Sequence, residues 1–186
     1  MRRSIEGIAV VFAWLMLVSC KSDYEKLVDK ELGSGVINDS LFLGFSFGQS
    51  RKEFFDHGWK QNKKGLIRQG PENKNIEHIL VADSAHSPIQ MLFYPDFNKE
   101  GKINRMDVRF RYSGWAPWNR KYFSDSLLIA VQDTIMSWYG GNEFMLMTYE
   151  EEPREIWVKV DGNRRISMRI KDEREVSMVI KDLLNE

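Results

Sequence analysis

The chain has 186 residues, 27 Lys and Arg against 27 Asp and Glu, and a single cysteine. A formal net charge of zero disfavours a dedicated nucleic-acid binder, which usually carries a basic excess. One cysteine excludes an internal disulfide and a four-cysteine zinc site, and 42% hydrophobic residues are typical of a folded globule of about one domain.

The chain begins with the pattern of an export signal. Arg2 and Arg3 precede an apolar run of 11 residues, Ile8–Val18, which is shorter than the roughly 18–20 residues of a spanning helix. The run ends in Leu17-Val18-Ser19-Cys20, which resembles the lipobox of bacterial lipoproteins. The resemblance implies that residues 1–19 are a cleaved signal peptide and that Cys20 carries lipid, whose acyl chains hold the protein on a bilayer. The alternatives are an ordinary signal peptide and a hydrophobic helix packed on the domain.

The residues after Cys20 bear on location. Lys21-Ser22-Asp23-Tyr24-Glu25 resembles the export signals of surface lipoproteins in some Gram-negative bacteria. We therefore expect a lipid-anchored protein of the cell envelope, in the outer membrane, with the periplasmic or surface side left open. Residues 20–40 are predicted to be a lipidated N-terminus and linker, because they contain Gly33-Ser34-Gly35 and a polar cluster at 38–40.

The domain, residues 41–186, is expected to begin with a helix and strands. Ser50 and Glu53 form a capping box, which predicts a helix to about Asn62. Strands are predicted over Ile76–Val81, Ile89–Tyr94 and Met106–Tyr112, the last with strict alternation of apolar and charged residues.

The second half repeats this order. A helix is predicted over Ser124–Tyr139, with an apolar stripe at Leu128, Val131, Ile135 and Trp138, and Gly140 stops it. Four strand patterns follow, over Phe144–Tyr149 and around 156–160, 166–170 and 176–180; in the second, Ile156, Val158 and Val160 mark the inward face.

A helix followed by strands, twice and without βαβ spacing, predicts an α+β fold with helices packed on one face of one or two antiparallel sheets. The halves would be about 41–113 and 114–186. The order of elements resembles the α+β domain of small envelope lipoproteins related to outer-membrane assembly factors and of β-lactamase-inhibitor proteins, over roughly residues 41–182.

Cations gather on the strand positions expected to point away from the core. If they share one face, that face suits an anionic partner such as a polysaccharide, a phosphorylated lipid or an acidic protein loop. The alternative is an ordinary solvated face, in which acidic residues such as Asp107 and Glu175 pair with the cations. The candidate positions are Arg105, Arg109, Arg111, Trp157, Lys159, Arg165, Arg169 and Lys171.

Trp115 and Trp118 flank Pro117 in a predicted loop, 113–118. Loop tryptophans can stack on sugar rings, but they also cover the end of a small core.

Residues 96–107 resemble an EF-hand calcium loop. Its oxygen ligands would be Asp96, Asn98, Glu100 and Asp107. The flanking segments are predicted strands where an EF-hand needs helices. We therefore favour a β-hairpin turn over Asn98–Gly101, with Gly101 at the left-handed position.

Catalytic motifs are weak. Asp83 and His86 share a loop with Ser84 and Ser87, but no nucleophile elbow, HExxH, P-loop or GxGxxG motif accompanies them. The sequence therefore predicts no catalytic residue and no cofactor. The expected function is non-enzymatic binding or scaffolding of an envelope protein or anionic envelope component; the alternative is a small secreted hydrolase or glycan-binding accessory protein.

Overall fold

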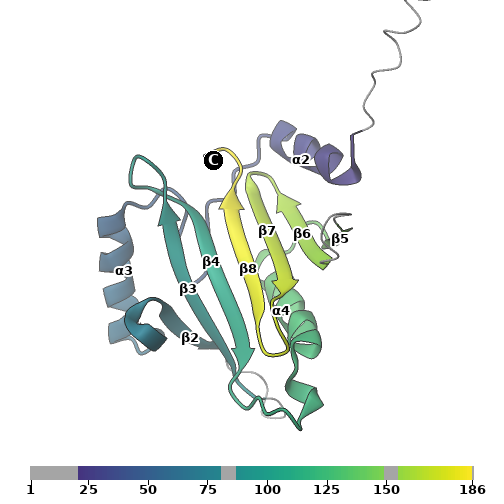
Figure 1. Ribbon diagram of the computed structural model, residues 1–186. Helices are drawn as coiled ribbons and strands as arrows, with labels where there is room; N and C mark the ends of the chain where they lie inside the picture. The colour runs from purple at the N-terminus through teal and green to yellow at the C-terminus, as the bar shows by residue number, and fades with distance from the viewer. Residues whose placement is uncertain (1–20, 81–86, 149–154, 186) are drawn as a thin grey trace, which may run out of the picture.

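The structure is a computed structural model that describes residues 21–80, 87–148 and 155–185. Over these residues the chain forms three α-helices and one eight-stranded antiparallel sheet, so its class is α+β as predicted (Figure 1). The helices are α2 (Asp23–Gly33), α3 (Arg51–Lys63) and α4 (Ser124–Tyr139), with short 3-10 turns η1 (Pro71–Asn73) and η2 (Arg120–Tyr122). The strands are β1 (Arg68–Gln69), β2 (Ile76–Leu80), β3 (Ile89–Phe97), β4 (Ile103–Tyr112), β5 (Met145–Thr148), β6 (Glu155–Asp161), β7 (Arg164–Ile170) and β8 (Val176–Asp182).

The strand order is β1-β2-β3-β4-β8-β7-β6-β5. Each half of the domain contributes one helix followed by four strands, and the two sets of strands join where β4 pairs with β8. The sequence did not distinguish between one sheet and two. Because the last strand of the first half pairs with the last strand of the second half, the domain has a single sheet.

The period-two pattern of the strands divides the sheet into two faces. Phe93, Val108, Met178 and Met168 are neighbours across four strands and define what we call the core face. Leu92, Arg109, Ser177 and Arg169 form the adjacent row and define the outer face. The core-face row is fully buried, because helix side chains pack on it.

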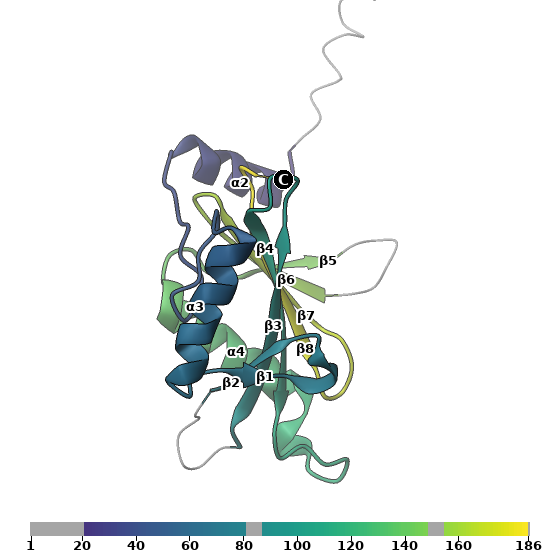
Figure 2. The same cartoon turned by 90° about the vertical axis from the view of Figure 1, so that its left-hand side faces the viewer.

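Two helices and an irregular segment supply those side chains. The Ser50–Glu53 capping box begins α3, and α4 has the predicted bounds. Leu127, Val131 and Ile135 of α4 join the hydrophobic core cluster, as does Phe54 of α3. Between the helices, the rings of Phe42 and Phe45 lie 4.9 and 5.6 Å from that of Phe93. Figure 2 shows α3 and α4 on the same side of the sheet.

Residues 23–33 form helix α2 where the sequence analysis expected a linker. Ser22 and Glu25 form a full capping box, so this segment carries the same start signal as α3. The helix is attached to the turn between β6 and β7: the Gly162 amide donates to Glu31, and Arg165 donates to the Tyr24 hydroxyl. The glycines at 33 and 35 end the helix and do not make the whole segment a linker.

The predicted orientation of β6 is wrong. Trp157 lies opposite Met168 and Lys159 lies opposite Ile166, so both point to the core face. The Lys159 side chain is 0% exposed, and its ammonium group binds the Asn142 carbonyl and the Asp161 carboxylate. Because Val158 and Val160 are also buried, β6 is covered on both faces, and alternation alone does not identify the inward one.

Candidate functional sites

The outer face contains a shallow groove of about 650 Å³ over β3, β4, β8 and β7. Four of the eight predicted positions line it: Arg105, Arg109, Arg169 and Lys171. Arg109 and Arg169 lie in one row, separated by Ser177. The strand pairing therefore brings together cations that are distant in the sequence.

Most of these cations are paired with carboxylates. Arg105 lies 2.7 Å from Asp107, while Lys171 and Arg109 lie 2.8 and 3.8 Å from Glu175. In the described part of the chain, Arg169 has no ion-pair partner. The outer face is thus closer to the solvated, charge-paired surface that the sequence offered as the alternative.

The other four predicted positions do not line this groove. Arg111 lies on the same face, but its guanidinium donates to Gln90. Arg165 binds Tyr24 of α2, while Trp157 and Lys159 point to the core face.

Arg111 belongs to a polar network that ends at a buried carboxylate. Gln90 also donates to Glu77 at 2.8 Å, and Arg68 binds Glu77 at 2.6 Å. The hydrogen bond from Arg68 holds the pKa of Glu77 below its ordinary value. This network stabilises the β1–β2 edge of the sheet and leaves Glu77 engaged within the fold.

The two loop tryptophans have different environments. The Trp115 ring lies 5.9 Å from that of Phe123, and the Arg174 guanidinium stacks 4.3 Å above it. Trp118 is 85% exposed. Trp115 therefore covers the end of the core, and Trp118 alone keeps a free ring surface.

The EF-hand-like segment forms the predicted β-hairpin. Asn98 Oδ1 accepts hydrogen bonds from the amides of Glu100 and Lys102, and Gly101 has φ 73°. The Asp96 and Asp107 carboxylates both face Arg105. Within the described ranges no group of three or more metal-ligating side chains occurs.

Cys20, Asp83, Ser84 and His86 lie outside the described residues. Ser87 is described, and its hydroxyl accepts a hydrogen bond from the Gly114 amide, which ties the start of β3 to the loop after β4.

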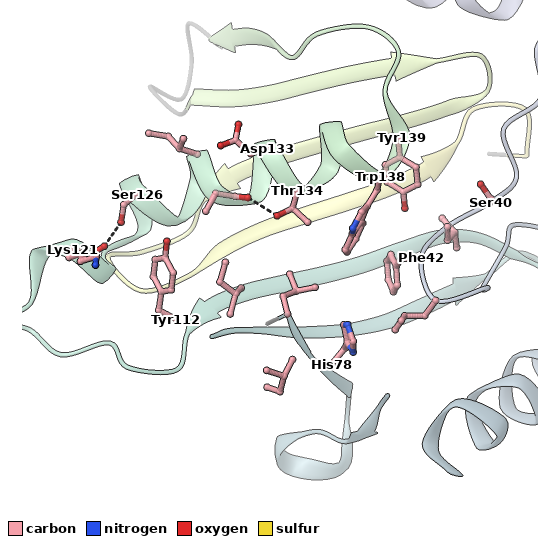
Figure 3. A pocket seen from close by; sticks show the side chains of 17 residues that line it. Ser40, Phe42, His78, Tyr112, Lys121, Ser126, Asp133, Thr134, Trp138 and Tyr139 are labelled. Atoms are coloured by element: carbon pink, nitrogen blue, oxygen red, sulfur yellow. Dashed lines mark hydrogen bonds between the residues drawn. The ribbon is translucent and has the colours of Figure 1, made fainter. Parts of the chain in front are cut away.

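A larger cleft, of about 1240 Å³, lies beside α4 on the helix side of the sheet (Figure 3). The floor comes from β2, β3 and β4, one wall from α4, and the other from residues 40–43. Its apolar lining residues are Leu41, Phe42, Leu43, Ile79, Leu80, Ile89, Tyr112, Ile129, Ala130 and Trp138. No sequence pattern predicted this cleft, because its walls come from segments distant in the chain.

Few polar groups in this cleft are available for chemistry. The hydroxyls of Ser126 and Thr134 donate to the carbonyls of Lys121 and Ala130, as the dashed lines in Figure 3 show. His78 Nδ1 lies 2.5 Å from the Leu66 carbonyl. Burial raises the pKa of Tyr112 above its ordinary value. The arrangement suits contact with an apolar partner, and among the described lining residues no nucleophile lies beside a base.

The sequence held one signal of the cleft. The predicted stripe on α4 ends at Trp138, which is 38% exposed, and Ile129 lies off the stripe and is 62% exposed. These two large apolar side chains of α4 remain accessible and mark its side of the cleft.

No protein-family model, curated protein or solved structure matches this chain. In the described parts of the chain, none of the helices has the length and apolar character needed to cross a bilayer.

Proposed function

We propose that this protein is a lipid-anchored binding protein of the bacterial cell envelope, attached through Cys20 to the outer membrane, without enzymatic activity. The lipobox, Leu17–Cys20, and the positive charges of Arg2 and Arg3 before the apolar run support the anchor. With α3 and α4 packed on one face of the sheet, the domain offers two separate surfaces to a partner: the α4 cleft and the outer face.

We place the binding site in the α4 cleft, and its apolar lining is the observation that carries this choice. Well-formed apolar clefts are the usual sites of binding, and exposed tryptophans are frequent anchors at protein interfaces. The proposed partner is an envelope protein that inserts an elongated apolar segment along α4. The outer-face groove is less suited, because most of its cations already have partners within the domain.

The cleft is tested by affinity purification from detergent extracts with two variants of α4. Trp138→Ala removes the accessible ring from the cleft wall, whereas Ser137→Ala changes a neighbouring exposed residue that does not line it. We expect a protein enriched by the wild type to be lost with Trp138→Ala and kept with Ser137→Ala. Equal recovery with both variants would contradict the proposed site.

The anchor is tested by palmitate labelling. The wild type should incorporate label, and Cys20→Ala should not. An unlabelled wild type would contradict the anchoring.

A second candidate is an acidic partner on the outer face, favoured by Arg169, which lies in one row with Arg109 and has no ion-pair partner among the described residues. Here the variant is one in which Arg109, Arg111, Arg169 and Lys171 are all changed to Glu. Identical partners for this variant and the wild type would remove the candidate. A glycan-binding role has one observation in its favour, the exposed ring of Trp118.

A further inference from the structure

The folded body begins almost at the proposed anchor. Only Lys21 and Ser22 separate Cys20 from the first residue of α2. The Ser22 amide donates to the Glu25 carboxylate at 2.7 Å, and the Glu25 amide donates back to Ser22 Oγ at 3.2 Å. Lys21 pairs with Asp29 on the same helix. The start of α2 is thus determined by its own cap.

Helix α2 is in turn held on the sheet at several points. The Gly162 amide donates to Glu31 at 3.0 Å, and Arg165 donates to the Tyr24 hydroxyl at 3.0 Å. After the helix, the Asn38 amide donates to Asn163 Oδ1 at 2.6 Å, and its side chain donates to the Asp161 carbonyl at 2.9 Å. These contacts join α2 and the segment after it to the turn between β6 and β7.

We infer that α2, held on the buried turn between β6 and β7, forms a membrane-apposed surface that rests against lipid headgroups. This inference depends on the anchoring of Cys20 proposed above. A tether of two or three residues reaches about 10 Å, whereas a 20-residue linker would reach about 70 Å. The anchor therefore keeps this end of the domain, which we call the α2 end, at the bilayer.

The opposite end of the sheet is then distant from the membrane. The ten residues of β4 span about 33 Å, and β4 ends next to the loop that contains Trp118. Figure 1 shows α2 and the C-terminus together at one end of the strands, and η2 at the other. The Ser40 end of the α4 cleft is the membrane-proximal one, because Arg164 of the α2 end donates to the Ser40 carbonyl, and the Lys121 end is the distal one.

The chemistry of α2 fits a headgroup layer and not the hydrocarbon interior. Its exposed side chains include both signs of charge, and Lys26 pairs with Asp23 at 2.9 Å. Such a surface gains little from a strongly anionic membrane and does not insert, so the lipid on Cys20 supplies the affinity. The contact between the α2 end and the headgroups sets the orientation of the domain relative to the bilayer.

The test uses the full-length lipidated protein in vesicles of phosphatidylcholine and phosphatidylethanolamine. A photo-crosslinking amino acid is placed at Lys26 on α2, or at Trp118 in the distal loop, and crosslinks to lipid are counted. We expect about tenfold more lipid crosslinking from position 26 than from position 118. A Gly/Ser insertion of about 20 residues after Lys21, which keeps Cys20-Lys21 and the Ser22 cap, should bring the two positions close to equal.

Palmitate incorporation is measured on the same samples. Labelled protein with equal crosslinking at both positions, or an unchanged ratio after the insertion, overturns the membrane-apposed surface and leaves the anchor intact. Unlabelled protein overturns both the anchor and this inference.

Discussion

The core face and the outer face of the sheet are built from the same strands, but their side chains satisfy different requirements. On the outer face, charged side chains pair with one another: Arg105 with Asp107, and Lys171 with Glu175. On the core face, apolar side chains pack against α3 and α4, except along the α4 cleft. The cations of the outer face are therefore largely neutralised by carboxylates of the same domain. On the core face, part of the apolar surface remains accessible in the α4 cleft.

The difference between the faces matters for locating function. Cations on an exposed sheet face find nearby carboxylates at little cost, so their presence alone is a weak signal of a ligand. Large apolar side chains that remain accessible have no such partner within the fold. For this protein the second kind of signal is the more informative.

The largest expected effect comes from emptying the core face. Phe93→Ala removes a ring that contacts Phe42 and Phe45 and should lower the free energy of unfolding by about 3–5 kcal/mol. Arg109→Ala, on the outer face of the neighbouring strand, should cost about 1 kcal/mol or less. Urea denaturation of both variants measures this, and equal losses would contradict the division into two faces.

Two lysines test the difference between a buried and an exposed ion pair. Lys159→Met leaves the Asp161 carboxylate without its cation in the interior and should destabilise the fold by about 3 kcal/mol. Lys171→Met removes a half-exposed partner of Glu175 and should cost less than about 1 kcal/mol. If thermal denaturation gave equal shifts for the two, the assigned orientation of β6 would be incorrect.

The contact between α2 and the sheet should depend on pH. The hydrogen bond from the Gly162 amide holds the pKa of Glu31 below its ordinary value, so the charged form stabilises the folded state. This contribution is present above the unfolded-state pKa and is lost as the pH falls through the lower, folded-state pKa. Glu31→Gln should therefore be less stable than the wild type by about 1 kcal/mol at neutral pH.

The difference between Glu31→Gln and the wild type should disappear in acid, where the wild-type carboxyl is also protonated. Chemical denaturation of both proteins at neutral pH and at a series of successively lower pH values checks this. A difference that persists after the wild-type carboxyl is protonated would show that the contribution of Glu31 does not depend on its charge.

The smallest effect concerns Arg169. Because it has no ion-pair partner among the described residues, Arg169→Ser should change the free energy of unfolding by less than about 0.5 kcal/mol. Any loss of partner binding in this variant would then belong to the outer face itself. A large loss of stability would show that Arg169 is engaged within the fold, and would weaken the second candidate function.

Local signals in the sequence determined the elements. The Ser50–Glu53 capping box and the apolar stripe of α4 identified two helices, because caps and helical periodicity involve residues three or four apart. The alternation in β4 identified a strand with one wet face. The Ser22–Glu25 capping box is the same kind of local signal and marks the start of α2, whereas the glycines at 33 and 35 bear only on its end.

How these elements meet is visible only in the folded chain. Strand order, the pairing of β4 with β8 and the orientation of β6 depend on contacts between distant residues, and a shift of one residue reverses a strand's faces. The attachment of α2 to Gly162 and the α4 cleft likewise join segments separated by many residues. Composition and local spacing specify which residues are helical, extended or apolar; which of them remain accessible is set by packing.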